Sequence, residues 1–558
     1  MPRGDGAGGL LVHRPPVFAD APVLACAEGI SFWGGVDPET GTVIDTHHPQ
    51  RGASVAGTVL AMPTSRGSCT GSAVLLSLAL SGLAPRLLVF CEDEDVLTLG
   101  ALVAGLLFDR AVGVARLRAD AYDRVAASGR AGFDGSALVA DGHRIALGEG
   151  GGDGPALSDA DRRTLAGDDG PAPRIAMETV VAMARVQGAA RLIDVTRVHI
   201  DGCIYANDGN LTFARAMRDQ GARVRVPTTT NAISVDRARW RRQGVAPAFG
   251  TPAQELADAY VAMGAAPTFT CAPYLLADRP ARGERIAWAE SNAVVFANTV
   301  LGARTPKHPD FLDLMIAVTG RAPEAGAYLD EGRAPVAALD VALPEVVDDG
   351  TWPMLGWLAG RASPAGIPLL RGLERAGPSH DDLKALCAAF GTTSAAPMLH
   401  VAGVTPEADA WSGACLPAIR IGPEDLDAAR DGFAAPGARV DLVALGSPHL
   451  SADECRRFAD LLDGRRVADG VDVVLTLGAA VRAEIAACGT LARLEGAGAV
   501  VVSDCCWCSI ARPLFPPGAK VVMTNSGKYA HYGPGLTGCT TVFGSLADCA
   551  RAATRGRV

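Results

Sequence analysis

SVAGTVLAMPTSRGSCTGSAVLLSLALSG, residues 54–82, has the pattern of a strand, a small polar loop and a helix. The strand-like part is SVAGTVLAM and the helical part is AVLLSLALSG. The loop between them, residues 63–72, has small or hydroxyl-bearing residues and one Arg, which leave backbone N–H groups unobstructed at a helix start. Such a position favours a bound anion or a serine oxyanion. A helix-capping turn rich in serine explains the same residues equally well.

Around this loop, residues 22–115 are rich in short apolar runs separated by Gly and Pro, such as PVLACAEGISFWGG and PRLLVFC. These runs predict a compact β-rich module with a few packed helices. Residues 128–172 contain Gly, Asp and Ala with little periodicity, so we expect a peripheral excursion and a linker. The expected small domain therefore spans residues 1–172.

After residue 173 the pattern changes to helical stretches alternating with short apolar strands. Examples are the helical IAMETVVAMARVQGA and NLTFARAMRDQG, and the strand-like RLIDVTRVHI, GVDVVLTLG and GAVVVSDC. Alternation at this spacing predicts parallel α/β layers. Residues 173–558 are too many to fold around one hydrophobic core, so a large α/β domain of several lobes is expected.

The composition excludes several classes of protein. The 558 residues carry a net charge of −10, with 49% hydrophobic and 20% charged residues, and no Lys/Arg-dense stretch. This argues against a nucleic-acid partner. The N-terminal MPRGDGAGGLLVHRPP has no apolar core of a signal peptide, and no window suits a membrane span, so we expect a cytoplasmic protein without a membrane partner. The oligomeric state is not predicted.

The 14 cysteines then favour buried thiols and metal ligands over disulfides. Cys203 follows an apolar strand, Cys271 lies at a turn, and Cys505, Cys506 and Cys508 follow the strand GAVVVSD. The carboxyl ends of strands in α/β sheets face the ligand crevice, so these thiols could converge on iron. By spacing alone, buried structural cysteines explain them better.

Three polar runs interrupt apolar sequence: Thr228–Asn231, Trp288–Asn292 and Thr524–Tyr532. Each combines a chargeable group or hydroxyls with amide donors, as a site for a polar carboxylate would. Loop capping explains any one of them, but the three together favour a site. We expect the substrate-binding residues to come from these runs and the first loop: Ser65, Thr70, Thr229, Asn231, Glu290, Ser291, Asn292, Ser526 and Tyr532.

At this point the chain resembles the aconitase X family over nearly its whole length. GGVDPETGTVIDTHHPQRGASVAGTVLAMPTSRGSCTGS resembles the small swivelling domain of that family. TTTNAISVD, CAPYLL, AWAESNAVVFANTVLGART and TNSGKYAHYGPG resemble blocks of its large domain, of which the third is the most specific. The resemblance implies an aconitase-like fold, with the small domain closing over an α/β core that bears an iron–sulfur cluster.

The same resemblance implies the roles of individual residues. Ser68 matches the catalytic serine of the signature. In the mechanism that we expect, Arg66 of the same loop holds the Ser68 alkoxide, and Lys528 is a further catalytic candidate. Cys271 and Cys506 match cluster cysteines, with Cys505 a near competitor of Cys506. The block Gly-Cys-Pro-His of phosphate-substrate members reads Gly446-Ser447-Pro448-His449 here, so one ligand is missing and Cys203 is the expected replacement. The implied cofactor is [2Fe–2S], with [4Fe–4S] or a single iron as alternatives.

In this chain the small domain precedes the large domain in a single polypeptide. This arrangement resembles that of the bacterial members that act on cis-3-hydroxy-L-proline. The implied reaction is a hydro-lyase elimination, in which Ser68 takes the α proton and the product becomes Δ1-pyrroline-2-carboxylate. Dehydration of mevalonate 5-phosphate or another hydroxy acid is the nearer alternative. A non-enzymatic iron–sulfur redox sensor is the farther one, and it would not need the Ser68 loop.

Overall fold

The N-terminal strands close into an eight-stranded barrel in the computed structural model, which describes residues 8–45, 47–149 and 154–558. The strand order is β1-β5-β4-β3-β2-β6-β7-β8, and apolar side chains such as Leu11, Val59 and Val89 fill the interior. Closure leaves no free sheet edge. The strands are β1 (Gly9–His13), β2 (Phe18–Ala25), β3 (Val59–Ala61), β4 (Leu87–Phe90), β5 (Gly113–Leu117), β6 (Arg130–Phe133), β7 (Ala137–Ala140) and β8 (His143–Glu149).

Residues 130–149, expected to be a peripheral excursion, instead supply the last three strands of this barrel. The antiparallel pairs β6–β7 and β7–β8 turn at Gly135 and at Asp141-Gly142, all with positive φ. The Gly and Asp residues that hide the periodicity in the sequence are therefore the turn residues of two hairpins. The expected linker also contains α5 (Asp159–Ala166), which begins with a capping box at Ser158.

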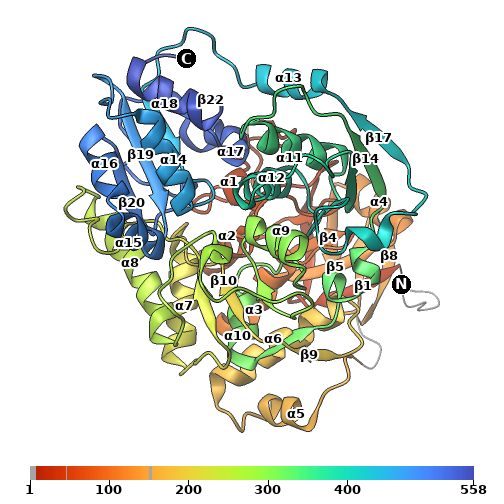
Figure 1. Ribbon diagram of the computed structural model, residues 1–558. Helices are drawn as coiled ribbons and strands as arrows, with labels where there is room; N and C mark the ends of the chain where they lie inside the picture. Colours follow the sequence, from red (N-terminus) through yellow and green to blue (C-terminus); the bar gives the residue numbers. More distant parts are fainter. Residues whose placement is uncertain (1–7, 46, 150–153) are drawn as a thin grey trace.

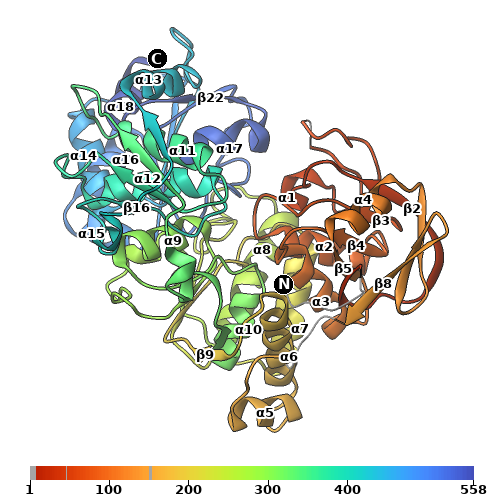
Figure 2. The same cartoon turned by 90° about the vertical axis from the view of Figure 1, so that its right-hand side faces the viewer.

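Helices of the small domain pack against the large domain. The helices are α1 (Phe32–Gly35), α2 (Gly71–Leu80), α3 (Val96–Phe108) and α4 (Ala119–Ala127), of which α4 packs instead on the barrel strands β2 and β3. α2 and α3 share one hydrophobic cluster with α6 (Pro171–Val186) and α7 (Asp208–Asp219) of the large domain. Figure 2 shows the barrel to one side of these helices, with the other lobes on the opposite side.

The first lobe of the large domain contains a three-stranded parallel sheet, ordered β11-β10-β12. These strands are β10 (Val198–Ile200), β11 (Thr228–Thr230) and β12 (Ala287–Trp288); β9 (Leu192–Asp194) pairs with β13 (Arg321–Pro323) nearby. The remaining elements are α8 (Pro247–Ala262), η1 (Pro273–Leu275), α9 (Ser291–Phe296), the π-helical η2 (Ala297–Leu301), α10 (Leu312–Thr319), η3 (Gly326–Tyr328) and η4 (Glu331–Arg333).

Two further lobes each contain a parallel sheet (Figure 1). The second lobe has the order β16-β15-β14-β17 and the third β20-β19-β18-β21-β22. The second comprises β14 (Ala337–Val341), α11 (Thr351–Ala362), β15 (Pro368–Arg371), α12 (His380–Thr393), β16 (His400–Val401), η5 (Ala408–Trp411), β17 (Ala418–Ile421) and α13 (Pro423–Asp431). The third comprises β18 (Leu442–Leu445), α14 (Ala452–Leu462), β19 (Asp472–Leu477), α15 (Ala479–Ala487), α16 (Thr490–Ala497), β20 (Val500–Ser503), β21 (Val521–Thr524), α17 (Gly527–Thr537), β22 (Thr540–Phe543) and α18 (Leu546–Arg555).

This architecture agrees with the predicted α/β class, with a β-rich N-terminal domain followed by several α/β lobes. Across the described ranges, none of the helices has the length and apolar character needed to cross a lipid bilayer.

Candidate active site

Each strand of the first-lobe sheet ends in a polar residue, and these three side chains meet. Asp201 follows β10, Asn231 follows β11 and Glu290 follows β12. The Asn231 amide donates to the Asp201 carboxylate and, at 3.2 Å, to Oε2 of Glu290. All three side chains are buried. They lie together because the carboxyl ends of parallel strands open on the same edge of a sheet.

A lysine from the third lobe completes this row. Lys528, at the start of α17, donates to Oε1 of Glu290 at 2.7 Å. Burial acts to raise the pKa of Glu290, but the Lys528 ammonium and its hydrogen bond hold that pKa below its usual value. Burial acts to lower the pKa of Lys528, but Glu290 and nearby thiols raise it well above its usual value. Both groups are therefore charged at neutral pH.

Three thiols lie beside Lys528. Hydrogen bonds from Cys271 and from Cys508 hold the pKa of the Cys506 thiol well below its usual value. The backbone N–H of His449 donates to Cys271 Sγ at 3.3 Å, and that of Cys508 donates to Cys506 Sγ at 3.4 Å. Thiolate character with backbone N–H donors is typical of sulfurs that ligate a metal or a cluster.

The small-domain loop reaches the same region from the other side. Cys69 Sγ donates to Oδ2 of Asp201 at 2.9 Å, across the two domains. Asp310, just before α10, interacts with the Cys69 and Thr70 side chains. Cys69, Asp201 and Asp310 each place one ligand atom within 4.8 Å of the other two, a spacing that could hold a cation.

Backbone strain accompanies these groups. Phe269, Phe311 and Asp504 have φ values of 37°, 85° and 69°. They lie within two positions of Cys271, Asp310 and Cys506. A positive φ is costly for residues with a side chain, and such strain persists where the surrounding structure enforces it, often at functional sites.

The chain has donor groups for the metal cofactor that the resemblance implies. Cys271, Cys506 and Cys508 are adjacent, and Lys528 offsets part of the negative charge that thiolates would bring. Soft thiolate donors of this kind suit iron or an iron–sulfur cluster. The residues present therefore fit such a group.

The structure does not bring Cys203 into this thiol cluster. Its thiol is fully buried in the core between the small and large domains and donates to the Ile200 carbonyl at 3.6 Å. Its main charged neighbours are Asp313 and Asp201. The thiol that lies beside Cys506 is instead that of Cys508, because the turn after β20 folds it back onto Cys506. Cys505, the competitor of Cys506, is buried separately beside Trp507.

On the small-domain loop, Ser68 and Thr70 form a pair. Ser68 Oγ donates to Thr70 Oγ1 at 3.2 Å and accepts from the Thr70 backbone N–H at 3.3 Å. Ser65 instead donates to Glu94 within the small domain, at 2.6 Å. Arg66, with 41% of its side chain exposed, forms ion pairs with Glu28 and Asp45.

The other expected substrate-binding residues lie at different distances from this row of buried polar side chains. Asn292 belongs to the row, since its amide donates to Oε1 of Glu290 at 2.5 Å and to the Cys271 carbonyl. Ser291 is half-buried at the start of α9. Two have partners elsewhere, Thr229 with His199 and Ser526 with the Ser447 carbonyl. Tyr532 donates to the Thr392 carbonyl, and its charged neighbours are groups of the site, Lys528 and Glu290 among them.

Sequence reasoning missed Asp201, Asp310 and Lys307, and it named Cys508 among the thiols that could converge on iron without placing it in the expected ligand set. Lys307 interacts with Cys69 and Glu290, while burial lowers its pKa to about 8. Lys307 and Asp310 lie two and five positions after the specific block AWAESNAVVFANTVLGART, and Asp201 directly follows a strand. Its position directly after a strand was the available signal for Asp201, and the same signal applied to the neighbouring Cys203.

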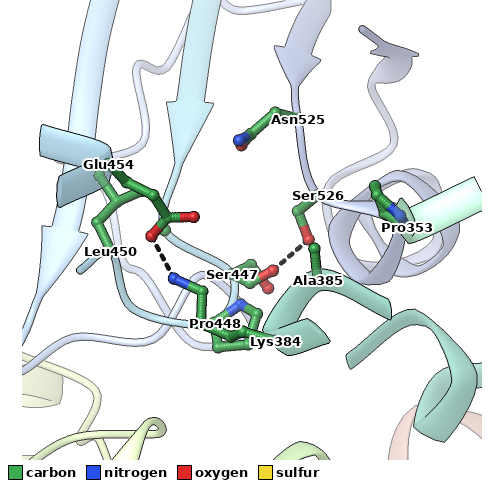
Figure 3. A pocket seen from close by; sticks show the side chains of 11 residues that line it. Pro353, Lys384, Ala385, Ser447, Pro448, Leu450, Glu454, Asn525 and Ser526 are labelled. Carbon is green, nitrogen blue, oxygen red and sulfur yellow. Dashed lines mark hydrogen bonds and ion pairs between the residues drawn. The ribbon is translucent and has the colours of Figure 1, made fainter. Parts of the chain in front are cut away.

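Ser447, which stands where the phosphate-substrate members have a cysteine, lies beside a pocket between the second and third lobes (Figure 3). A buried pair of Lys384 and Glu454 borders this pocket, and the Ser447 hydroxyl has no hydrogen-bond partner among the described residues. The volume of this pocket, with the open space at its mouth included, is about 310 Å³. Of the expected site residues, Ser526 lines it.

Comparisons with known proteins identify the class that this fold and site define. Four family models match in chain order: the aconitase X swivel domain at residues 15–137, the first domain at 155–331, the second at 335–431 and the third at 440–555. The chain belongs to the aconitase X family, as its sequence predicted.

Two of the relatives match along nearly the full chain, and a third matches over about two thirds of it. A cis-3-hydroxy-L-proline dehydratase of Pseudomonas aeruginosa is 50% identical over 563 residues, covering 98% of this chain and 97% of the relative. A protein of the same name from Hypocrea jecorina is 45% identical, covering 96% and 94%. The phosphomevalonate dehydratase large subunit of Methanothermobacter thermautotrophicus is 34% identical, covering 69% and 96%.

A solved structure supports the fold. The holo-form of Thermococcus kodakaraensis aconitase X superposes with a TM-score of 0.66 at 30% identity, covering 71% of this chain and all of that one. The predicted enzyme class, a hydro-lyase, is confirmed by the dehydratase relatives.

Proposed function

We propose that this enzyme dehydrates cis-3-hydroxy-L-proline to Δ1-pyrroline-2-carboxylate. The observation that carries the proposal is 50% identity, over 98% of the chain, to a cis-3-hydroxy-L-proline dehydratase. The site supports it, because the small-domain loop faces the carboxylates of Asp201 and Asp310 rather than a cluster of cationic side chains. A phosphate substrate requires such cations, whereas hydroxyproline is itself positively charged at its ring nitrogen.

The chain's own residues perform the elimination from the small-domain loop. Ser68 removes the proton from the α carbon; the C–H electron pair forms a C=C bond, and the hydroxyl leaves the neighbouring carbon. The Thr70 backbone N–H, 3.3 Å from Ser68 Oγ, stabilises the serine oxygen when it is negatively charged. The enamine product then tautomerises to the cyclic imine.

Lys307 binds the substrate carboxylate in this proposal. It interacts with Cys69, next to Ser68, and its Nζ donates to the Ser394 carbonyl at 3.0 Å, leaving other N–H groups for a ligand. Negative charge grows on the carboxylate as the α proton leaves, so a nearby ammonium lowers the barrier. The expected role of Arg66 in stabilising Ser68 is less well supported, since Glu28 and Asp45 engage its guanidinium.

Cys271, Cys506 and Cys508 hold the iron–sulfur cofactor in this proposal, with Cys508 replacing the expected Cys203. [2Fe–2S] remains the favoured form, because three thiols fit a small cluster whose remaining position is open. When bound, the iron would supply Lewis-acid assistance to the leaving hydroxyl. Lys528 and the two backbone N–H donors keep the thiolates charged and oriented.

The test begins with anaerobic purification followed by iron and sulfide analysis. The protein is then incubated separately with cis-3-hydroxy-L-proline, its trans isomer and mevalonate 5-phosphate, and products are followed by NMR. We expect turnover of the cis isomer alone, because one base position cannot serve both configurations. Turnover of mevalonate 5-phosphate instead would replace the substrate but keep the dehydratase class. Iron without turnover of any hydroxy acid would favour the redox sensor.

A further inference from the structure

Two buried carboxylates from separate segments of the large domain face one thiol of the small domain. Asp201 follows β10 and Asp310 precedes α10, and they are 7% and 1% exposed. Each places an oxygen within 4.8 Å of Cys69 Sγ and of the other carboxylate. Two carboxylates this close repel each other and are costly to bury unless a partner offsets their charge.

Their hydrogen bonds are incomplete. Asp201 accepts from the Asn231 amide and from the Cys69 thiol, both neutral donors. Asp310 interacts with the Cys69, Thr70 and Asp201 side chains, yet its Oδ1 has no hydrogen-bond partner within the described part of the chain. An unpaired buried carboxylate oxygen is costly to retain, so its persistence points to a ligand that supplies the missing donor.

The cations of the site are engaged by other groups. Lys528 pairs with Glu290 at 2.7 Å, and Lys307 donates to the Ser394 carbonyl at 3.0 Å. In residues 8–45, 47–149 and 154–558, no Lys or Arg forms an ion pair with Asp201 or Asp310. The adjacent Asp313 differs, because backbone N–H groups of Asp201 and Leu314 satisfy its carboxylate. The described residues therefore supply no positively charged partner to Asp201 and Asp310, whose mutual repulsion is otherwise relieved only by the proton that burial favours on the pair.

The geometry points to Asp201 and Asp310 as the subsite for the secondary ammonium group of the substrate, an inference that rests on the proposed function. A ring NH2⁺ carries two N–H donors, one for each carboxylate. It replaces the Cys69 thiol as the partner of Asp201 Oδ2 and gives Asp310 Oδ1 the donor it lacks. Because Cys69 adjoins Ser68, a nitrogen held there brings the neighbouring α carbon close to the base.

A metal ion is the rival occupant of the same three side chains. The structure favours the ammonium, because Cys69 donates a hydrogen bond to Asp201 and so holds its proton, whereas a metal binds the thiolate. The Asn231 amide also donates into Asp201 from the other side. An ammonium group between the carboxylates of Asp201 and Asp310 leaves the protonation states of the Cys69 thiol and the Asn231 amide unchanged.

The experiment compares two unreactive ligands that differ at one atom. L-Proline has the ring NH2⁺, and (S)-tetrahydrofuran-2-carboxylate has oxygen in its place. Their affinities are measured by calorimetry on the iron-loaded enzyme, on Asp310→Asn, and on the control Asp95→Asn, which neutralises a half-buried carboxylate of the small domain. Metal content of each protein is measured in parallel.

We expect the wild type and Asp95→Asn to prefer proline, and Asp310→Asn to lose about 10- to 100-fold of that preference, as for one charged hydrogen bond. Affinity for the oxygen analogue should change little. An unchanged preference in Asp310→Asn would overturn the inference, as would loss of one bound metal ion in that variant. If the wild type prefers proline but leaves cis-3-hydroxy-L-proline intact, the subsite stands and the proposed substrate fails.

Discussion

Replacing Ser68 by alanine should abolish turnover while leaving the fold and the iron in place. Ser68 is half-buried and its hydroxyl makes two long hydrogen bonds, of 3.2 and 3.3 Å, both to Thr70. Their loss should cost only about 1 kcal/mol of unfolding free energy. Loss of a general base costs about 10²–10⁴-fold in rate. The effect on catalysis should therefore greatly exceed the effect on stability.

The matched control is Ser77→Ala, in α2 of the same domain. The Ser77 hydroxyl bonds to Asn207 at 2.6 Å and to the Gly209 N–H at 3.0 Å, fixing α2 to α7. This control should lose about 1–3 kcal/mol of stability, because it removes two hydrogen bonds between α2 and the start of α7, and keep its activity. Steady-state rates, urea unfolding and iron content are measured for both variants. Near-normal activity of Ser68→Ala would remove Ser68 from the mechanism; equal loss of iron and activity would make the loop structural.

Three further outcomes follow from the site and its surroundings. Cys508→Ser should bind much less iron than the wild type, whereas Cys203→Ser should keep it; the reverse pattern would restore the original ligand set. Glu290→Gln leaves Lys528, whose side chain is only 12% exposed, without its carboxylate, so urea unfolding should show a loss of about 3 kcal/mol, and a neutral result would refute the pairing. Burial raises the pKa of Asp95 to about 6. Above pH 6 the carboxylate is ionised in both the folded and the unfolded state, and burying its charge lowers the free energy of unfolding. Below about pH 4 it is protonated in both states and this loss of stability disappears. Asp95→Asn should therefore stabilise the protein by roughly 1–3 kcal/mol at pH 8, with the gain vanishing towards pH 4; a gain independent of pH would contradict this.

Much of the fold was predictable because strands, helices and turns depend on neighbouring residues. The pattern of residues 54–82 predicted β3, the polar loop and α2, and the alternation after residue 173 predicted the parallel lobes. The prediction failed at residues 130–149, where turn glycines interrupt short strands. Those strands become recognisable only when they pair around the barrel, since pairing and not local pattern makes a short strand stable.

By itself, the sequence determined the α/β class, the family and the polar residues that end the strands. Only the tertiary structure decided which of these residues meet. Cys508 rather than Cys203 joins Cys506, and Asp201 contacts Cys69 although 132 positions separate them. No local pattern encodes these contacts, because they depend on how the small domain and three lobes pack against one another. That packing brings unpaired carboxylates, thiols and lysines into one buried site, where their charges shift each other's pKa and become available for chemistry.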